Sequence, residues 1–181
     1  MIQLCSSSPT RAMLLDKFDV RYIQKSPNYD EDKIKTRVAK DFVYTASLGK
    51  LNASIKEFGL EYPLLCADTV ISSSSQILRK AKSKSDAKRI LELQSGSIIS
   101  IISSVHYKTD KMLFSDISAT YYKFYKFDKD DMQDYLDSNI WQGKAGACMV
   151  EGFCKKYIKS VYGLESTAMG LQVEKLLPWI K

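Results

Sequence analysis

The sequence has few of the residues from which metal centres and disulfide frameworks are built. One histidine in 181 residues excludes a histidine-rich metal site. The four cysteines form no CxxC pair, and three of them lie in apolar or small-residue stretches. We therefore expect four reduced, partly buried thiols and neither a disulfide nor a zinc site. His106 lies in a strand-like run, which favours a structural role at a strand edge over membership of a Ser/His/Asp triad.

Long apolar runs are also missing. No segment approaches the roughly 18 uncharged apolar residues that span a bilayer. The opening MIQLCSSSPTR has neither the basic region nor the long apolar region of a signal peptide. We expect a cytoplasmic protein with no membrane partner. With 45% hydrophobic and 27% charged residues, the composition is ordinary for a globular protein, and we predict a single domain over residues 1–181 with room for two lobes.

The net charge of +6 favours an anionic partner. The lysines are spread along the chain and do not concentrate in one region, which argues against nucleic acid as that partner. One stretch, YYKFYKF at residues 121–127, mixes aromatic and basic residues as a nucleic-acid surface does. The same alternation is more typical of a half-buried strand, so we predict a strand there.

Hydrophobic patterning predicts a mixed α/β fold. The predicted strands cover residues 2–5, 20–23, 62–71, 97–108, 112–127, 147–150 and 154–163, with 97–108 and 112–127 as an antiparallel pair. The predicted helices begin near Pro9, run from about Glu31 to Phe58 with a kink or break at Gly49, and cover 85–96, 128–138 and 170–180. Ser85 is expected to cap the third of these helices, and Gly96 to lie just past its end.

The stretch SSSPTRAMLLDKF, residues 6–18, combines a turn of small hydroxyl residues with the start of a helix. Such a turn presents free backbone N–H groups, and the helix dipole adds partial positive charge at the same place. Arg11 adds a planar guanidinium suited to phosphate. Two interpretations remain open, a phosphate-binding turn and a plain helix cap.

Asp68, in the stretch CADTV, is expected near the end of an apolar strand. A carboxylate there is costly unless it is paired or holds a cation. In α/β sheets, ligands gather at the carboxyl ends of strands. Asp68 is therefore a candidate ligand for Mg²⁺ or Mn²⁺, or a general base directed at water. The alternative is an aspartate that only turns the chain.

Three lysines lie beside apolar elements: Lys50 in LGKL, Lys80 in ILRKAK and Lys144 in GKAGA. Together with Arg11 and the acidic Glu31 and Asp68, they would make a triphosphate–metal site. The site is not a P-loop, because no GxxxxGK[ST] motif occurs.

These motifs together resemble those of the Maf family, the septum-formation-associated nucleoside triphosphate pyrophosphatases allied in fold to the inosine triphosphatases. The resemblance covers nearly the whole chain. It is carried, in order, by LCSSSPTRAMLL, YDED, LGKL, ADTV, ILRKAKS, LELQSG and GKAGACMVEG. It implies an α/β fold of two lobes around an elongated mixed central sheet flanked by helices, with a cleft between the lobes, and it implies a homodimer.

The resemblance also implies a reaction and roles for individual residues. The reaction is hydrolysis of a nucleoside triphosphate to the monophosphate and pyrophosphate with Mg²⁺ or Mn²⁺. Asp68 falls on the proton acceptor for the attacking water, and Glu31 on an acidic position that helps to hold metal together with it. The substrate-binding positions are Ser7, Arg11, Lys50, Lys80 and Lys144.

Three further positions, Thr10, Thr69 and Glu151, fall where the family sets its choice of base. The threonine at position 69 is similar to the residue of the family branch that acts on dTTP and UTP. The glutamate at position 151 is similar to the residue of the branch that acts on 7-methyl-GTP. The chain departs from the family pattern at Thr10, where a second arginine is usual, and after Gly96, where a histidine is usual. These departures keep open an alternative, a non-catalytic nucleotide- or nucleic-acid-binding protein linked to cell division.

Overall fold

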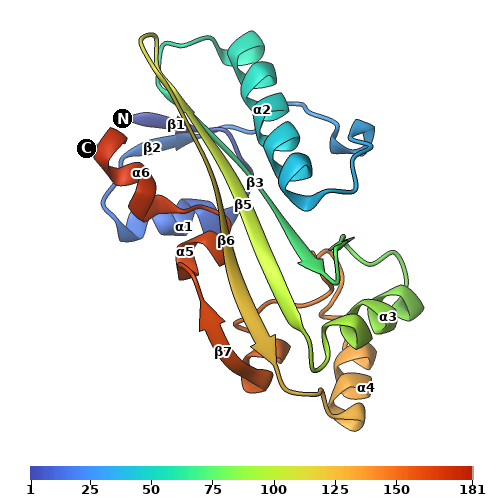
Figure 1. Ribbon diagram of the computed structural model, residues 1–181. Helices are drawn as coiled ribbons and strands as arrows, with labels where there is room; N and C mark the ends of the chain where they lie inside the picture. Colours follow the sequence, from blue (N-terminus) through green and yellow to red (C-terminus); the bar gives the residue numbers. More distant parts are fainter. Residues whose placement is uncertain (181) are drawn as a thin grey trace. The chain divides into compact units, whose positions relative to one another are not determined.

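Apolar strand segments separated by amphipathic helices build a mixed α/β structure, seen in a computed structural model that describes residues 1–180 (Figure 1). Within that range the strands form one seven-stranded sheet in the order β2-β1-β3-β5-β6-β7, with β4 paired to β3. The predicted fold class, a mixed sheet flanked by helices, is confirmed. The strands are β1 (Ile2–Leu4), β2 (Tyr22–Gln24), β3 (Leu64–Ser73), β4 (Gln76–Leu78), β5 (Ile98–Lys108), β6 (Leu113–Phe124) and β7 (Ile158–Tyr162).

Six α-helices and two short 3-10 helices accompany the sheet in the described part of the chain. They are α1 (Pro9–Lys17), α2 (Ala39–Phe58), α3 (Lys84–Gln94), α4 (Lys129–Asp137), α5 (Glu165–Ala168), α6 (Val173–Ile180), η1 (Glu31–Lys33) and η2 (Phe153–Tyr157). Among residues 1–180, no helix combines the length and the apolar character needed to cross a bilayer.

The chain divides into two compact units. The first comprises 1–69, 102–119 and the chain from Leu164 onward, and the second comprises 70–101 and 120–163. Strands β3, β5 and β6 each contribute residues to both units.

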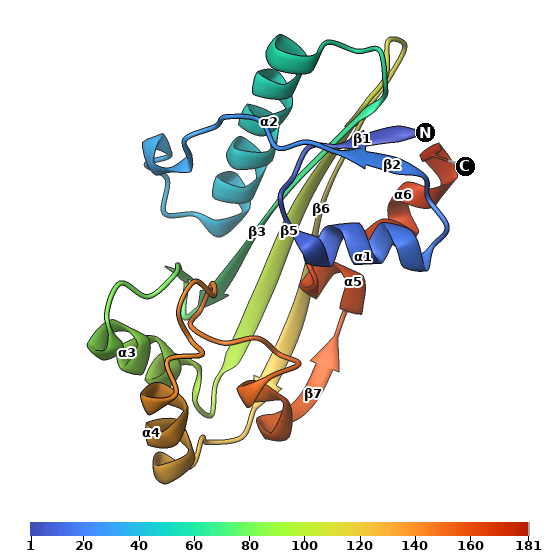
Figure 2. The ribbon, with the colours of Figure 1, turned by 180° about the vertical axis from the view of Figure 1, so that it is seen from behind.

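In the first unit, β1 pairs in parallel with β2 on one side and β3 on the other. Helix α1 makes the crossover from β1 to β2 and lies beside them (Figure 2). The core is apolar because β1, β3, β5, α1 and α6 each bury one face of aliphatic side chains. Its fully buried members are Leu4, Leu15, Leu65, Ala67, Val105, Leu171, Val173 and Leu176.

The second unit is held by antiparallel pairing and by an aromatic cluster. Strand β7 pairs with β6, with Tyr121 opposite Tyr162 and Lys123 opposite Ser160. The predicted strand in YYKFYKF is confirmed through Phe124, because exposed and buried side chains alternate along it.

Several predicted elements are wrong. The helix expected over 31–58 begins only at Ala39, and Gly49 does not divide it. Residues 147–150 form turn and irregular backbone and no strand, and only the second half of 154–163 is a strand. The N-cap of α3 is Ser83, whose hydroxyl accepts from the Asp86 N–H, and not Ser85.

Two predictions about single side chains are also wrong. Cys148 and Cys154 form a disulfide, although Cys5 and Cys66 are free and buried as expected. His106 does not lie at a strand edge. It lies in β5, whose neighbours on both sides are β3 and β6, and its side chain is 0% exposed.

Candidate functional site

The turn from β1 into α1 is held in one shape by its own hydroxyl groups. The Ser6 hydroxyl accepts from the Ser8 N–H at 3.2 Å and from Arg11 Nη1 at 3.0 Å. Ser8 is the N-cap of α1, and its Oγ accepts from the Arg11 N–H at 3.4 Å. Gln24, at the end of β2, donates to the Ser6 carbonyl oxygen at 2.8 Å. Ser7 is exposed between these fixed points, at the N-terminal end of α1, where an anion would be favoured.

Arg11 is nearly buried, at 9% exposure, and ties α1 to two distant segments. Its Nε donates to the Gly170 carbonyl oxygen at 2.8 Å, and its Nη2 donates to Thr69 Oγ1 at 3.2 Å. Burial lowers the pKa of the guanidinium, whereas the negative charges of Asp68 and Glu31 raise it. A guanidinium has five N–H donors. Its contacts with Ser6, Thr69 and Gly170 use three of them, which leaves two for an anion.

Thr69 continues this network. Its Oγ1 shares a hydrogen bond of 2.8 Å with Ser103 Oγ, and Ser103 donates to the Thr167 carbonyl oxygen at 2.8 Å. The Thr69 hydroxyl thus hydrogen-bonds to Arg11 of α1 and to Ser103 of β5, and Ser103 in turn hydrogen-bonds to Thr167 of α5.

Asp68 is the most deeply placed of the candidate acidic residues, at 5% exposure. Lys50 of α2 donates to its Oδ1 at 2.6 Å and also forms an ion pair with Glu31. Burial raises the pKa of the Asp68 carboxyl, Lys50 and Arg11 lower it, and the charge of Glu31 raises it; the net direction is upward. A raised carboxyl pKa suits a general base that works near neutral pH.

The position of Asp68 differs from the one expected. β3 continues to Ser73, so Asp68 lies inside its own strand and not near the end. The neighbouring strand β1 does end there: Leu4 is in register with Leu65, and the Cys5 N–H still donates to the Leu65 carbonyl oxygen. Asp68 therefore lies beside the carboxyl end of β1, the edge at which α/β sheets bind ligands.

Asp68 and Thr69 are successive strand residues, so their side chains point to opposite faces of the sheet. Asp68 contacts Lys50 on α2, and Thr69 contacts Arg11 on α1. The first unit therefore brings Glu31, Lys50 and Asp68 together on one face. Arg11 and Thr69 meet on the other.

The carboxylates suit a divalent cation. Glu31 and Asp68 both form an ion pair with the Lys50 ammonium nitrogen. A positive charge therefore already lies between the two carboxylates. Mg²⁺ is commonly held by one or two carboxylates together with substrate phosphates and waters. The residues present therefore fit such an ion.

Of the remaining candidate residues, Thr10 is half-buried in the first turn of α1, in the first unit, whereas Lys80, Lys144 and Glu151 belong to the second unit. Lys80 forms an isolated antiparallel bridge with Ala145, and the Gly146 N–H donates to the Arg79 carbonyl oxygen at 3.2 Å. This pairing brings the backbone of Lys80 alongside that of Lys144. Glu151 is exposed in the turn that follows.

Sequence reasoning missed several residues that shape the first unit's site: Ser6, Gln24, Ser103, Thr167 and Gly170. Ser6 lay within a stretch that carried the resemblance, but no pattern indicated that Ser6 or Gly170 holds Arg11. Gly170 has φ +101, and a Cβ there would lie 3.2 Å from Thr69 Oγ1. The close approach of the segment between α5 and α6 to Thr69 and Arg11 thus depends on a residue without a side chain.

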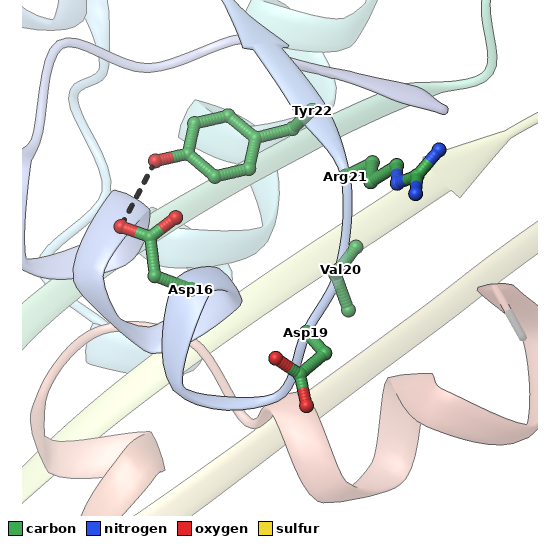
Figure 3. Close-up of a pocket in the computed structure, with 5 residues that line it drawn as sticks. All are labelled: Asp16, Asp19, Val20, Arg21 and Tyr22. Carbon is green, nitrogen blue, oxygen red and sulfur yellow. Dashed lines mark hydrogen bonds between the residues drawn. The ribbon is translucent and has the colours of Figure 1, made fainter.

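A separate hollow of about 700 Å³ lies at the other end of α1 (Figure 3). It is lined by Asp16, Asp19, Val20, Arg21 and Tyr22, and the Tyr22 hydroxyl donates to Asp16 Oδ2 at 3.3 Å. None of the candidate site residues lines it. The candidate residues Ser7 and Arg11 lie at the opposite, N-terminal end of α1.

Comparison with known proteins gives one family. The family model described as Maf-like protein matches residues 1–181. The chain is 49% identical over 178 residues to a nucleoside triphosphate pyrophosphatase of a Nitratiruptor species, covering 97% of this chain and 96% of the relative. It is 35% identical over 184 residues to the protein of that name from Campylobacter jejuni subsp. jejuni, covering 99% and 100%. It is 34% identical over 178 residues to the protein of that name from a strain of Helicobacter pylori, covering 98% and 94%.

The fold is a mixed sheet with an acidic and basic cluster at the end of its first strand, and the family match spans the chain. This chain belongs to the Maf-like protein family.

Proposed function

We propose that this chain hydrolyses a nucleoside triphosphate to the monophosphate and pyrophosphate. The observation that carries the proposal is Asp68: a buried carboxylate with a raised pKa, held by Lys50 beside the carboxyl end of β1. A protein that only bound nucleotide would have little use for such a base. The name nucleoside triphosphate pyrophosphatase, printed for relatives up to 49% identical, supports the same reaction.

In the proposed step, Asp68 accepts a proton from a water molecule as the water oxygen attacks the α-phosphorus. The new bond joins the water oxygen to the α-phosphorus, and the bond from that phosphorus to the bridging oxygen of pyrophosphate breaks. Negative charge grows on the departing pyrophosphate, and fixed positive groups near it lower the barrier. Arg11 and the exposed Ser7 would hold phosphate at the N-terminal end of α1, and Lys50 would supply further positive charge. For Lys80 and Lys144, in the second unit, the resemblance to the family implies a role in substrate binding.

We further propose that Glu31 and Asp68 hold a divalent cation, Mg²⁺ or Mn²⁺. When bound, it would neutralise phosphate charge and polarise phosphoryl oxygens. Lys50, whose ammonium contacts both carboxylates in the structure, would lie beside the cation and the triphosphate and keep its charge near Asp68.

Base choice is assigned to Thr10, Thr69 and Glu151, with dTTP, UTP and 7-methyl-GTP as candidate substrates. Thr69 is fastened to Arg11 and Ser103, so it would present a fixed surface to a base. Glu151 is exposed, and its carboxylate would favour a base that offers N–H donors or carries positive charge, as 7-methylguanine does.

The experiment is a product assay with Mg²⁺ or Mn²⁺ on dTTP, UTP, CTP, GTP and 7-methyl-GTP, scoring pyrophosphate separately from phosphate. Asp68→Asn is expected to lower kcat by about 10²- to 10⁴-fold, the usual contribution of a general base. Asp110→Asn, at an exposed turn position, is the matched control and should leave the rate unchanged.

Three outcomes would contradict the proposal. Phosphate released without pyrophosphate would rule out attack at the α-phosphorus. An unchanged rate in Asp68→Asn would remove Asp68 as the base. Binding of nucleotide or of single-stranded nucleic acid without any hydrolysis would support the alternative, a non-catalytic binding protein.

A further inference from the structure

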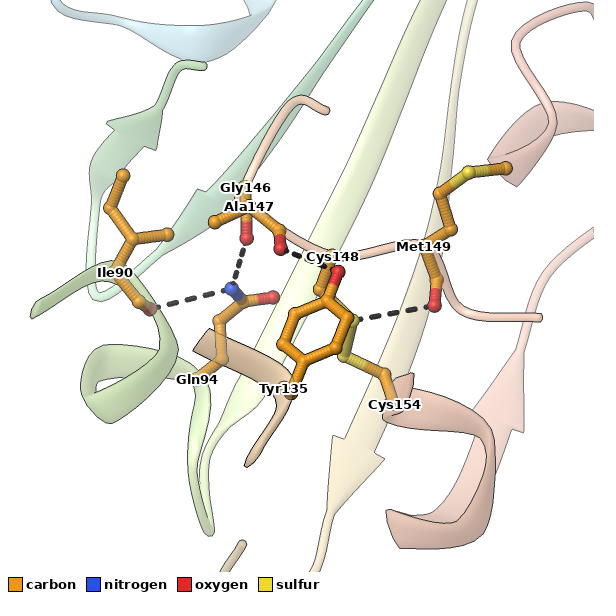
Figure 4. The surroundings of a disulfide bond; sticks show 8 residues. All are labelled: Ile90, Gln94, Tyr135, Gly146, Ala147, Cys148, Met149 and Cys154. Carbon is orange, nitrogen blue, oxygen red and sulfur yellow. Dashed lines mark hydrogen bonds between the residues drawn. A yellow bond between two sulfur atoms is a disulfide. The ribbon is translucent and has the colours of Figure 1, made fainter. Parts of the chain in front are cut away.

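The disulfide between Cys148 and Cys154 closes a short loop in the second unit, and that loop contains Glu151 (Figure 4). The two cysteines are six positions apart, with Cα atoms 6.5 Å apart. Their side chains are buried, at 4% and 2% exposure, whereas Glu151 between them is exposed. The bond thus lies beneath a turn whose acidic side chain faces solvent.

The chain before this loop is anchored by side chains from two helices. Gln94 of α3 donates to the Gly146 carbonyl oxygen at 2.7 Å, and Tyr135 of α4 donates to the Ala147 carbonyl oxygen at 3.0 Å (Figure 4). The same segment carries Lys144 and pairs with Lys80 through Ala145. Lys144 therefore lies shortly before the disulfide in the chain, and the backbone of Lys80 is paired beside it.

The last residue within the loop, Phe153, is anchored by aromatic packing. The Phe153 ring stacks on Tyr135 with centroids 4.5 Å apart and also contacts Phe127 and Tyr157. Within the loop itself, the Gly152 N–H donates to the Met149 carbonyl oxygen at 3.0 Å. The exposed turn thus has firm anchors on both sides, and the disulfide is the covalent link between them.

We propose that the Cys148–Cys154 disulfide is a positioning device for the base-selecting turn. It holds Glu151 at a set place, and its reduction releases the turn and relaxes nucleotide selection. The inference rests on the proposed function, in which Glu151 takes part in base choice. Cys148 and Cys154 are positioning residues, since their sulfurs act through the backbone of the turn.

Reduction follows ordinary thiol–disulfide exchange with a small dithiol such as dithiothreitol. One thiolate of the reductant attacks a protein sulfur, forming a mixed disulfide and releasing the other cysteine as a thiolate. The second thiol of the reductant then displaces the remaining cysteine. The balance is two protein thiols gained after protonation and one dithiol oxidised to a cyclic disulfide.

The first part of the test needs no catalysis. The full chain is denatured and alkylated with and without dithiothreitol, and alkylated cysteines are mapped by mass spectrometry. We expect only Cys5 and Cys66 to be alkylated without reductant, and all four cysteines after reduction. Amide hydrogen exchange of the native chain should become faster on reduction within 146–153, with 2–5 as an internal reference. Four alkylated cysteines without reductant, or unchanged exchange, would overturn the inference.

The second part measures kcat/KM for 7-methyl-GTP, GTP and dTTP in both redox states. Reduction and the double variant Cys148→Ser/Cys154→Ser should change the ratios between nucleotides in the same direction and several-fold, and reductant should have no further effect on the double variant. In Glu151→Ala, reduction should no longer change the ratios. Ratios that stay constant in the native chain, or that change equally in Glu151→Ala, would refute a positioning role. If no nucleotide is hydrolysed in either state, the proposed function fails while the alkylation and exchange results still decide whether the disulfide holds the turn.

Discussion

The charge of Lys50 most directly sets the pH range in which Asp68, the proposed base, is deprotonated. Its ammonium is 2.6 Å from Asp68 Oδ1 and lowers the pKa of that carboxyl, against the larger upward effect of burial. An opposite charge at this distance shifts a carboxyl pKa by about one unit or more.

We predict that Lys50→Met moves the acidic limb of the kcat/KM profile to higher pH. Removing the ammonium leaves burial and Glu31, which both raise the pKa of Asp68, so the base would be deprotonated only at higher pH. The shift should be about one pH unit or more. The check is a pH–rate profile beside Lys56→Met, at the exposed C-terminal end of the same helix. An acidic limb that stays in place would mean that Asp68 is not the titrating base.

His106 makes the fold sensitive to acid. Among the described residues neither of its ring nitrogens has a hydrogen-bond partner, and burial lowers its pKa from 6.5 to about 4. The unfolded chain therefore binds more protons than the folded chain between these values, so the free energy of unfolding falls as pH drops through that window. At 1.36 kcal/mol per pH unit, the loss between pH 6.5 and 5 is about 2 kcal/mol.

His106→Leu should abolish this loss, since leucine fills a similar volume and carries no titrating group. The measurement is urea unfolding at pH 7, 6 and 5 for both proteins. Asp68, whose pKa is raised, acts in the opposite direction in both proteins, so it cancels in the difference. Parallel pH dependences in the two proteins would contradict a neutral buried His106.

At the scale of the elements, the approach of the segment between α5 and α6 to Arg11 of α1 and Thr69 of β3 depends on Gly170. Its φ of +101 is strained for any side chain, and a Cβ would lie 3.2 Å from Thr69 Oγ1 and 3.4 Å from Arg11 Nε. Gly170→Ala should therefore lower the free energy of unfolding by about 1–3 kcal/mol and also reduce kcat/KM, because Arg11 must move. Gly59→Ala is the matched control, just past the C-terminal end of α2, with φ +72 and open space around it. Equal effects of the two variants on kcat/KM would show that strain alone, and not Arg11, is responsible.

The position of the loop carrying Glu31 depends on a second glycine, in the middle of α2. A Cβ on Gly49 would overlap the Tyr29 ring at 2.2 Å. Gly-to-Ala changes inside a helix normally stabilise by about 1 kcal/mol. Here Gly49→Ala should instead displace Tyr29, and with it Glu31 two residues later, so kcat/KM should fall. Combining Tyr29→Ala with Gly49→Ala should recover part of the lost kcat/KM, which steady-state kinetics on the single and double variants would measure. If the double variant shows no recovery, the overlap with Tyr29 is not the cause of the loss.

For the molecule as a whole, most of the fold could be predicted from apolar periodicity. The failures occurred where local hydrogen bonds compete with helix and strand. Residues 34–38 stay outside α2, and Thr36 there accepts from the Val38 N–H at 3.2 Å, a local bond that competes with a helix. Residues 147–150 have an apolar strand-like composition, but Ala147 has φ +54 and Cys148 is bonded to Cys154. Spacing alone does not predict that bond.

The candidate site could be predicted as a set of residues but not as an arrangement. The motifs led to Arg11, Lys50 and Asp68, and the structure shows that Lys50 contacts Asp68. It could not be seen beforehand that Arg11 contacts Thr69 and Gly170, because those contacts join segments up to 159 positions apart. Their roles in catalysis and in base choice stay predictions, as do the homodimer, the cytoplasmic location and any part in cell division.

The central claim, water attack at the α-phosphorus assisted by Asp68, is tested most directly by hydrolysis in ¹⁸O-labelled water. The reaction uses the best substrate from the product assay, and the masses of the separated products are measured by mass spectrometry. The account predicts one ¹⁸O atom in the nucleoside monophosphate and none in the pyrophosphate, with both products lost in Asp68→Asn. Label in the pyrophosphate would place the attack at the β-phosphorus and contradict the account.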